Sequence, residues 1–82
     1  MNAKDLLDSQ FLEMRWRCLS LAADLDRVQR HAGGADVIKT DSRLATLRQA
    51  MALLQGDEPG RAERVQVLFS DHSPSPISNR KL

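Results

Sequence analysis

The residues of this chain best suited to chemistry are one cysteine, Cys18, and two histidines, His31 and His72. A zinc site needs three or four His, Cys or carboxylate ligands held together. Nucleophilic catalysis needs a serine or cysteine beside a base and an orienting group. The sequence contains no HxxxH or CxxC spacing, and the two histidines fall in different predicted environments. We therefore expect no metal, no cofactor and no catalytic residue, so that the protein is not an enzyme.

Cys18 is the only cysteine, which excludes an internal disulfide framework. It falls among regularly spaced apolar residues, so the sequence predicts a small buried side chain in a reducing compartment. Of the nearby cations, only Arg15 lies on the same side of a helix. The N-terminus lacks the features of a secretory signal, and no apolar run is long enough to cross a bilayer. These features predict a cytoplasmic protein.

The strongest pattern in the chain is a stripe of apolar residues spaced 3-4-3-4-3-4, which keeps one side of a helix facing a partner. Its members are Phe11, Met14, Cys18, Leu21, Leu25, Val28 and Ala32. The pattern predicts a helix from about Ser9 to His31, ended by the following glycine pair. The alternative is a single helix from about residue 3, capped by Asn2 with Asp5 in its first turn.

A loop is predicted over residues 33–40, and a second helix is predicted to begin after a cap at Thr40 or Asp41. Leu44, Leu47, Met51 and Leu54 repeat the 3-4-3 spacing, and Gly56 ends this helix. A third helix is predicted over residues 59–70, with Pro59 at its first position, where proline is tolerated. The Ser- and Pro-rich residues 71–82 predict a disordered tail.

These elements predict an all-α fold: a long helical hairpin plus a short third helix, forming a three-helix bundle. Residues 1–70 are expected to form one helical domain, followed by the tail. The predicted common core contains Met14, Cys18, Leu21, Leu25, Leu47, Met51, Leu54, Val65, Leu68 and Phe69.

The charge balance argues against a strongly basic binding surface. The 82 residues include 12 Lys and Arg and 11 Asp and Glu, giving a formal net charge of +1. The short connection between the second and third helices permits a helix-turn-helix. However, Arg61 and Arg64 share their predicted helix with Glu63, and phosphate affinity comes from many cationic contacts. A nucleic-acid-binding protein is therefore the second hypothesis.

A second apolar stripe gives the best indication of function. Leu12, Trp16, Leu19 and Ala23 are spaced 4-3-4, on a different side of the first helix from the main stripe. Either the third helix covers this stripe in a monomeric bundle, or another chain covers it. Aromatic residues are enriched at the centres of interfaces. We therefore expect a protein-interaction or oligomerisation module that pairs with itself as a homodimer or with a helical protein partner.

The expected lack of a metal site has a direct test. A chelator should leave the thermal unfolding midpoint unchanged, because no ligand set couples metal binding to folding. A shift of several degrees, measured by circular dichroism with and without chelator, would instead reveal a site that uses His31 or His72.

Overall fold

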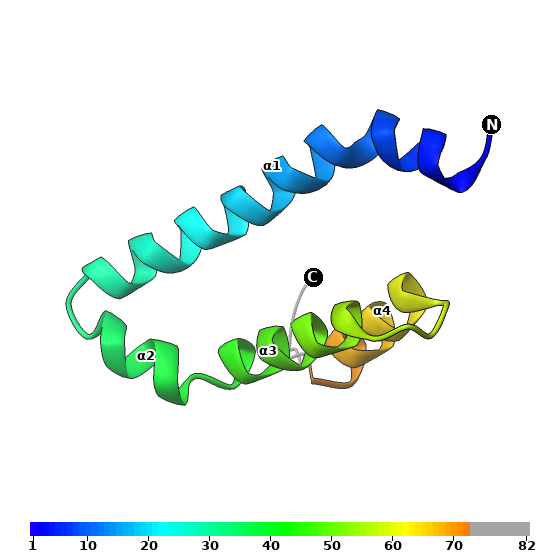
Figure 1. Cartoon of the computed structure of the whole chain (residues 1–82). Helices are drawn as coiled ribbons and strands as arrows, with labels where there is room; N and C mark the ends of the chain where they lie inside the picture. Colours follow the sequence, from blue (N-terminus) through cyan, green and yellow to red (C-terminus); the bar gives the residue numbers. More distant parts are fainter. Residues whose placement is uncertain (73–82) are drawn as a thin grey trace. The chain divides into compact units, whose positions relative to one another are not determined.

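The computed structural model describes residues 1–72, which contain four helices and no strand. In chain order they are α1 (Ala3–Arg30), α2 (Gly34–Thr40), α3 (Ser42–Gln55) and α4 (Arg61–His72) (Figure 1). The predicted all-α class is confirmed. The chain divides into two compact units, residues 1–38 and the residues from 39 onward. The three-helix bundle and the single domain stay predictions.

Helix α1 begins at Ala3, as the alternative start predicted, so the start near Ser9 is wrong. The cause is a capping box at Asn2. The Asp5 backbone N–H donates to Asn2 Oδ1 at 2.9 Å, and the Asn2 N–H donates to Asp5 Oδ2 at 3.4 Å. This reciprocal pair satisfies two N–H groups that a helix end leaves without a partner. No proline or glycine interrupts the 28 residues that follow.

The turn between α1 and α2 depends on two adjacent glycines. Gly33 has a φ of 77°, which L-residues rarely adopt, and the Gly34 N–H donates to the His31 carbonyl at 2.8 Å. Gly34 is buried, and a Cβ there would lie 2.1 Å from the Val28 carbonyl oxygen and 2.6 Å from that of Gln29. The beginning of α2 therefore meets the last turn of α1 backbone to backbone.

The predicted loop over residues 33–40 is wrong, because α2 occupies most of it. The glycine pair does end α1. It also allows a new helix to begin at once, and the Val37 N–H donates to the Gly33 carbonyl at 3.0 Å. A helix of 7 residues is too short to show a period in the sequence.

Helix α3 is capped by Asp41, one of the two predicted caps, and ends at Gly56 as predicted. The Arg43 backbone N–H donates to Asp41 Oδ1 at 2.8 Å. The Arg43 guanidinium also donates to both carboxylate oxygens, each at 2.9 Å. Because these bonds favour the ionised carboxylate, they lower the pKa of Asp41 to about 2.

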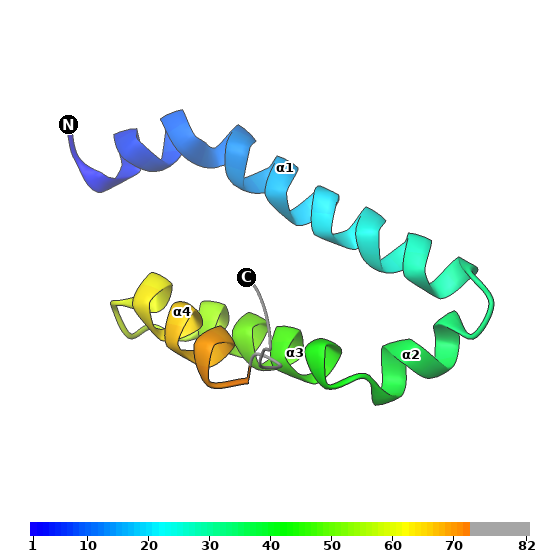
Figure 2. The same ribbon diagram turned by 180° about the vertical axis from the view of Figure 1, so that it is seen from behind.

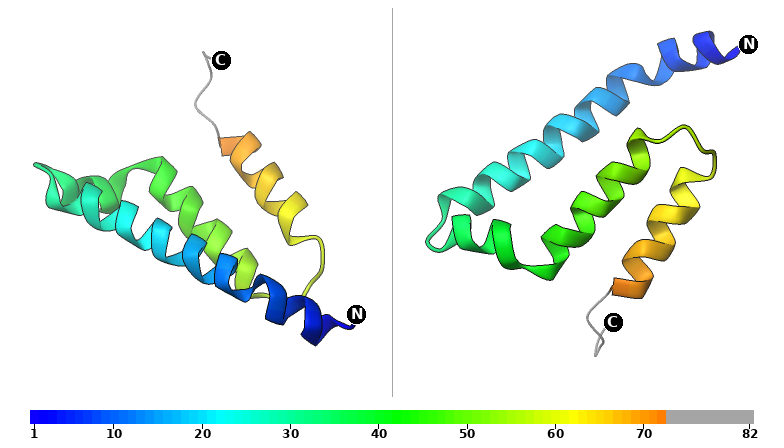
Figure 3. Two further views of the ribbon diagram at one scale, coloured as in Figure 1. Left: turned by 90° about the horizontal axis from the view of Figure 1, so that it is seen from above. Right: turned by 60° about the horizontal axis from the view of Figure 1, so that its bottom comes forward.

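Helices α3 and α4 lie side by side and form a hairpin (Figures 2 and 3). Helix α4 begins at Arg61, so the prediction that Pro59 opens the third helix is wrong. Gly60 precedes it with a φ of 79°, and the Arg64 N–H donates to the Gly60 carbonyl at 3.1 Å. The helix continues to His72, two residues into the predicted tail. The rest of that tail, residues 73–82, lies outside the described residues.

The predicted common core is wrong in part. Six of its ten members are half-buried: Leu21, Leu25, Leu47, Met51, Val65 and Leu68. Four are exposed: Met14, Cys18, Leu54 and Phe69. The buried side chains of the described part are instead small ones on α3, Thr46 and Ala50. The spacing predicted which side of each helix is apolar, but spacing alone does not determine how far a neighbour covers that side.

The close contact at Gly34 predicts that adding a single methyl group there lowers the free energy of unfolding substantially. Gly34→Ala should lower the free energy of unfolding by about 1–3 kcal/mol, because backbone atoms must move to make room. Gly56→Ala is the matched control, since its Cβ would meet only the Leu53 carbonyl oxygen at an ordinary 3.6 Å. Urea unfolding followed by circular dichroism measures both. Equal stability of the two variants would contradict the close approach.

The cap at Asp41 predicts a defined response to acid. An aspartate in an unfolded chain has a pKa of about 3.9, whereas the folded value is about 2. The stabilisation is therefore complete above about pH 4 and is lost as the pH falls through about 2. Asp41→Asn should remove this dependence while keeping an oxygen that caps the helix. Helix content should be measured between pH 5 and pH 1.5. It should fall more steeply with decreasing pH in the wild type than in Asp41→Asn.

Candidate protein-interaction surface

The second apolar stripe lies on α1, and its large side chains are accessible. Leu12 is 68% exposed, Trp16 62% and Leu19 47%, and Ala23 is also exposed. All four belong to one uninterrupted helix, so they share one side over about 16 Å of its length. No residue of α1 is buried. The structure therefore places the predicted interface residues together on an accessible face.

Ion pairs within α1 surround this face. Lys4 pairs with Asp8 at 3.2 Å, Arg17 pairs with Glu13 at 3.8 Å, and Arg27 pairs with Asp24. More than half of each of these side chains is exposed, so each pair contributes little to stability. Their effect is to keep the remaining surface of the helix well solvated.

A shallow depression of about 350 Å³ adjoins the stripe at Leu19. Phe11, Met14, Arg15 and Cys18 line the rest of it. The prediction that Cys18 is buried is wrong, since the thiol is exposed. Arg15 lies beside it, as the helical spacing predicted. This depression extends the apolar surface around α1 towards the main stripe.

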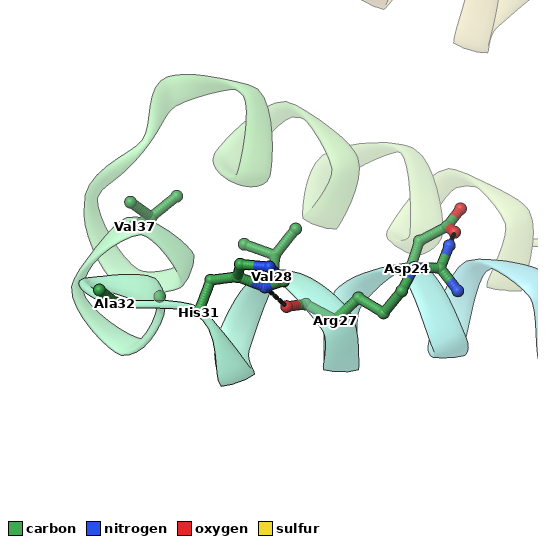
Figure 4. A pocket seen from close by; sticks show the side chains of 7 residues that line it. Asp24, Arg27, Val28, His31, Ala32 and Val37 are labelled. Atoms are coloured by element: carbon green, nitrogen blue, oxygen red, sulfur yellow. Dashed lines mark hydrogen bonds and ion pairs between the residues drawn. The ribbon is translucent and has the colours of Figure 1, made fainter.

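A second depression, of about 490 Å³, lies where α1 meets α2 (Figure 4). Its walls are mostly apolar, with Val28, Ala32 and Val37 among them. This depression was not predicted from the sequence, because residues 33–40 were expected to form a loop. The glycine pair was the only signal of this close approach in the sequence.

Two polar interactions involve the side chains of this corner. The Nδ1 of His31 lies 2.7 Å from the Arg27 carbonyl oxygen, and it must carry the proton because a carbonyl can only accept. The guanidinium of Arg27 pairs with Asp24 in turn. Within residues 1–72 no group of three or more His, Cys, Asp or Glu is placed to hold a metal ion.

The α3–α4 hairpin carries a third depression, of about 400 Å³, lined by Leu53, Glu63, Arg64, Val67 and Leu68. The arginines that a helix-turn-helix would direct to phosphates have partners within this hairpin. Arg61 Nε donates to the Gly56 carbonyl at 3.1 Å, and Arg64 pairs with Glu58 at 3.4 Å. These contacts give the nucleic-acid hypothesis no specific support.

Comparison with known proteins finds no matching protein family, no matching curated protein and no matching solved structure. Among the helices of residues 1–72, none combines the length and apolar character needed to cross a membrane.

Proposed function

We propose that this chain is a small helical interaction module without catalytic activity, which self-associates through one face of α1. The face consists of Leu12, Trp16, Leu19 and Ala23. The observation that supports the proposal is the exposure of Trp16 between two exposed leucines. Large aromatic side chains flanked by apolar neighbours are typical of the centres of interfaces. The commonest form of self-association is a twofold dimer, in which both copies use the same face.

The free energy available from this face is modest. Complete burial of a leucine or tryptophan side chain contributes about 1.5–3 kcal/mol, and about half to two thirds of each side chain is still accessible here. Two copies contribute six such side chains. Association costs about 4–15 kcal/mol in lost freedom. The expected dimer is therefore concentration-dependent, and it should be measured up to about 1 mM protein.

The decisive variant is Trp16→Ala. Sedimentation equilibrium should give the wild type a mass that rises from 9.2 kDa towards twice that value with concentration. Trp16→Ala should stay near the monomer mass and keep its helix content, because alanine is a good helix former. Trp16→Phe should retain most of the association, because it keeps an aromatic ring at the centre of the face.

Leu6→Ala is the matched control, since Leu6 is another exposed apolar residue of α1 and falls on a different side of the helix. It should associate like the wild type. A wild-type mass of 9.2 kDa at the highest concentration would overturn self-association. Under the monomeric-bundle hypothesis, Trp16→Ala would instead lower the unfolding midpoint strongly and leave the mass unchanged.

A further inference from the structure

The interaction face of α1 is the centre of a longer stripe with charged ends. Along the same side of the helix the spacing continues as 3-4-4-3-4-4-3, and at 100° per residue all members fall within an arc of about 100°. The members of this α1 stripe are Asp5, Asp8, Leu12, Trp16, Leu19, Ala23, Arg27 and Arg30. Its N-terminal end is acidic, its centre apolar and its C-terminal end basic.

The spacing of the α1 stripe reads the same in both directions, and its two ends carry opposite charges. When the α1 stripe is reversed end for end about a point between residues 17 and 18, Asp5 takes the place of Arg30, and Asp8 takes the place of Arg27. The same operation exchanges Leu12 with Ala23 and Trp16 with Leu19. Among these eight residues each acidic one is therefore level with a basic one, and each apolar one with an apolar one. Ser9 and Asp26 fall within the same arc and are level with each other.

We propose that the occupant of this face is the α1 helix of a second copy, running antiparallel in this register. The inference deepens the proposed self-association and rests on it. Asp5 and Asp8 of each copy lie opposite Arg30 and Arg27 of the other, which gives four oppositely charged pairs. A parallel arrangement would place Asp5 against Asp5 and Arg30 against Arg30, and like charges repel. In the antiparallel arrangement the two helix dipoles also point in opposite directions, which is favourable.

The apolar centre fits the same register. Leu12 opposes the small Ala23, so a large and a small side chain share each outer position. Trp16 opposes Leu19 near the twofold axis, which brings both indoles to the middle of the interface. The 3-4-4 spacing corresponds to about 3.67 residues per turn, close to an ordinary helix. Two nearly straight helices of 28 residues can therefore stay in contact along most of their length.

The interactions now made by the charged ends do not prevent this pairing. Asp8 and Arg27 are held only in exposed pairs on their own helix, with Lys4 and Asp24. Such pairs are weak and exchange readily. Asp5 uses Oδ2 in the capping box, and its other oxygen is not part of that box. Asp26 falls at the same angle as Asp8. In this register it is level with Ser9 of the other copy and about 1.5 Å along the axis from Asp8 of that copy, so Arg27 and Arg30 must outweigh one acid at their end of the α1 stripe.

Charge reversal tests the register. Asp8→Arg or Arg27→Asp alone converts two attractive pairs into repulsive ones, and each should raise the dimer dissociation constant by about tenfold at low salt. Both changes in one chain should return the constant to within about threefold of the wild type. Arg17→Glu is the matched control: it also reverses a charge and removes one exposed ion pair of α1, but it lies off the stripe. It should leave the constant unchanged.

Cross-linking tests the direction of the helices. In a Cys18→Ser background, Leu12→Cys and Ala23→Cys chains should form a mixed disulfide when combined and oxidised. In the antiparallel pair, position 12 of one copy lies about 16 Å along the axis from position 12 of the other. Neither variant should therefore cross-link to itself. Helix content measured by circular dichroism checks that every variant keeps α1.

The outcomes separate the two proposals. A wild type that stays monomeric overturns self-association and this register together. A wild-type dimer whose Leu12→Cys chains cross-link to themselves, or whose double charge variant fails to recover, overturns the antiparallel register alone. A dimer that passes both tests supports the α1 stripe as its interface.

Discussion

Helix α1 carries apolar side chains on two different sides, and a single neighbouring helix covers only one side of another. The main stripe contains Leu21 and Leu25, which are half-buried, whereas Leu12 and Trp16 on the second stripe are exposed. Solvent contact with a tryptophan and two leucines is unfavourable. This constraint links the length of α1, the accessibility of its second stripe and the proposal that another chain completes it.

Much of the fold could be predicted from local signals in the sequence. The stop at Gly56 was correct, and Asp41 was one of the two caps that the sequence left open, because side-chain hydrogen bonds and helix ends depend on residues a few positions apart. Asn2 was one of two plausible starts for α1, and only the capping box with Asp5 distinguished it. Helix α2 was not predicted, because two helical turns contain too few residues to show a helical period in the sequence.

The four residues of the predicted interface could be placed from spacing alone, since they share one uninterrupted helix. Burial could not be predicted in the same way. Met14 and Cys18 have the spacing of a core and are exposed, because burial depends on contacts between elements that no local pattern encodes. The charged ends of the α1 stripe were visible in the sequence as well. They were not singled out, because isolated acids and arginines on a helix resemble an ordinary solvated surface.

The contact of Gly34 with the end of α1 has a consequence for the history of this protein. Selection at most apolar positions accepts several residues of similar size, and heptad-like spacing recurs in unrelated helices. At position 34 any Cβ would collide with the backbone of the preceding helix, so a substitution there lowers stability whatever the protein binds. In divergent descendants of the same ancestor, the glycine at this corner should outlast the apolar stripes and serve as the fixed point for aligning them.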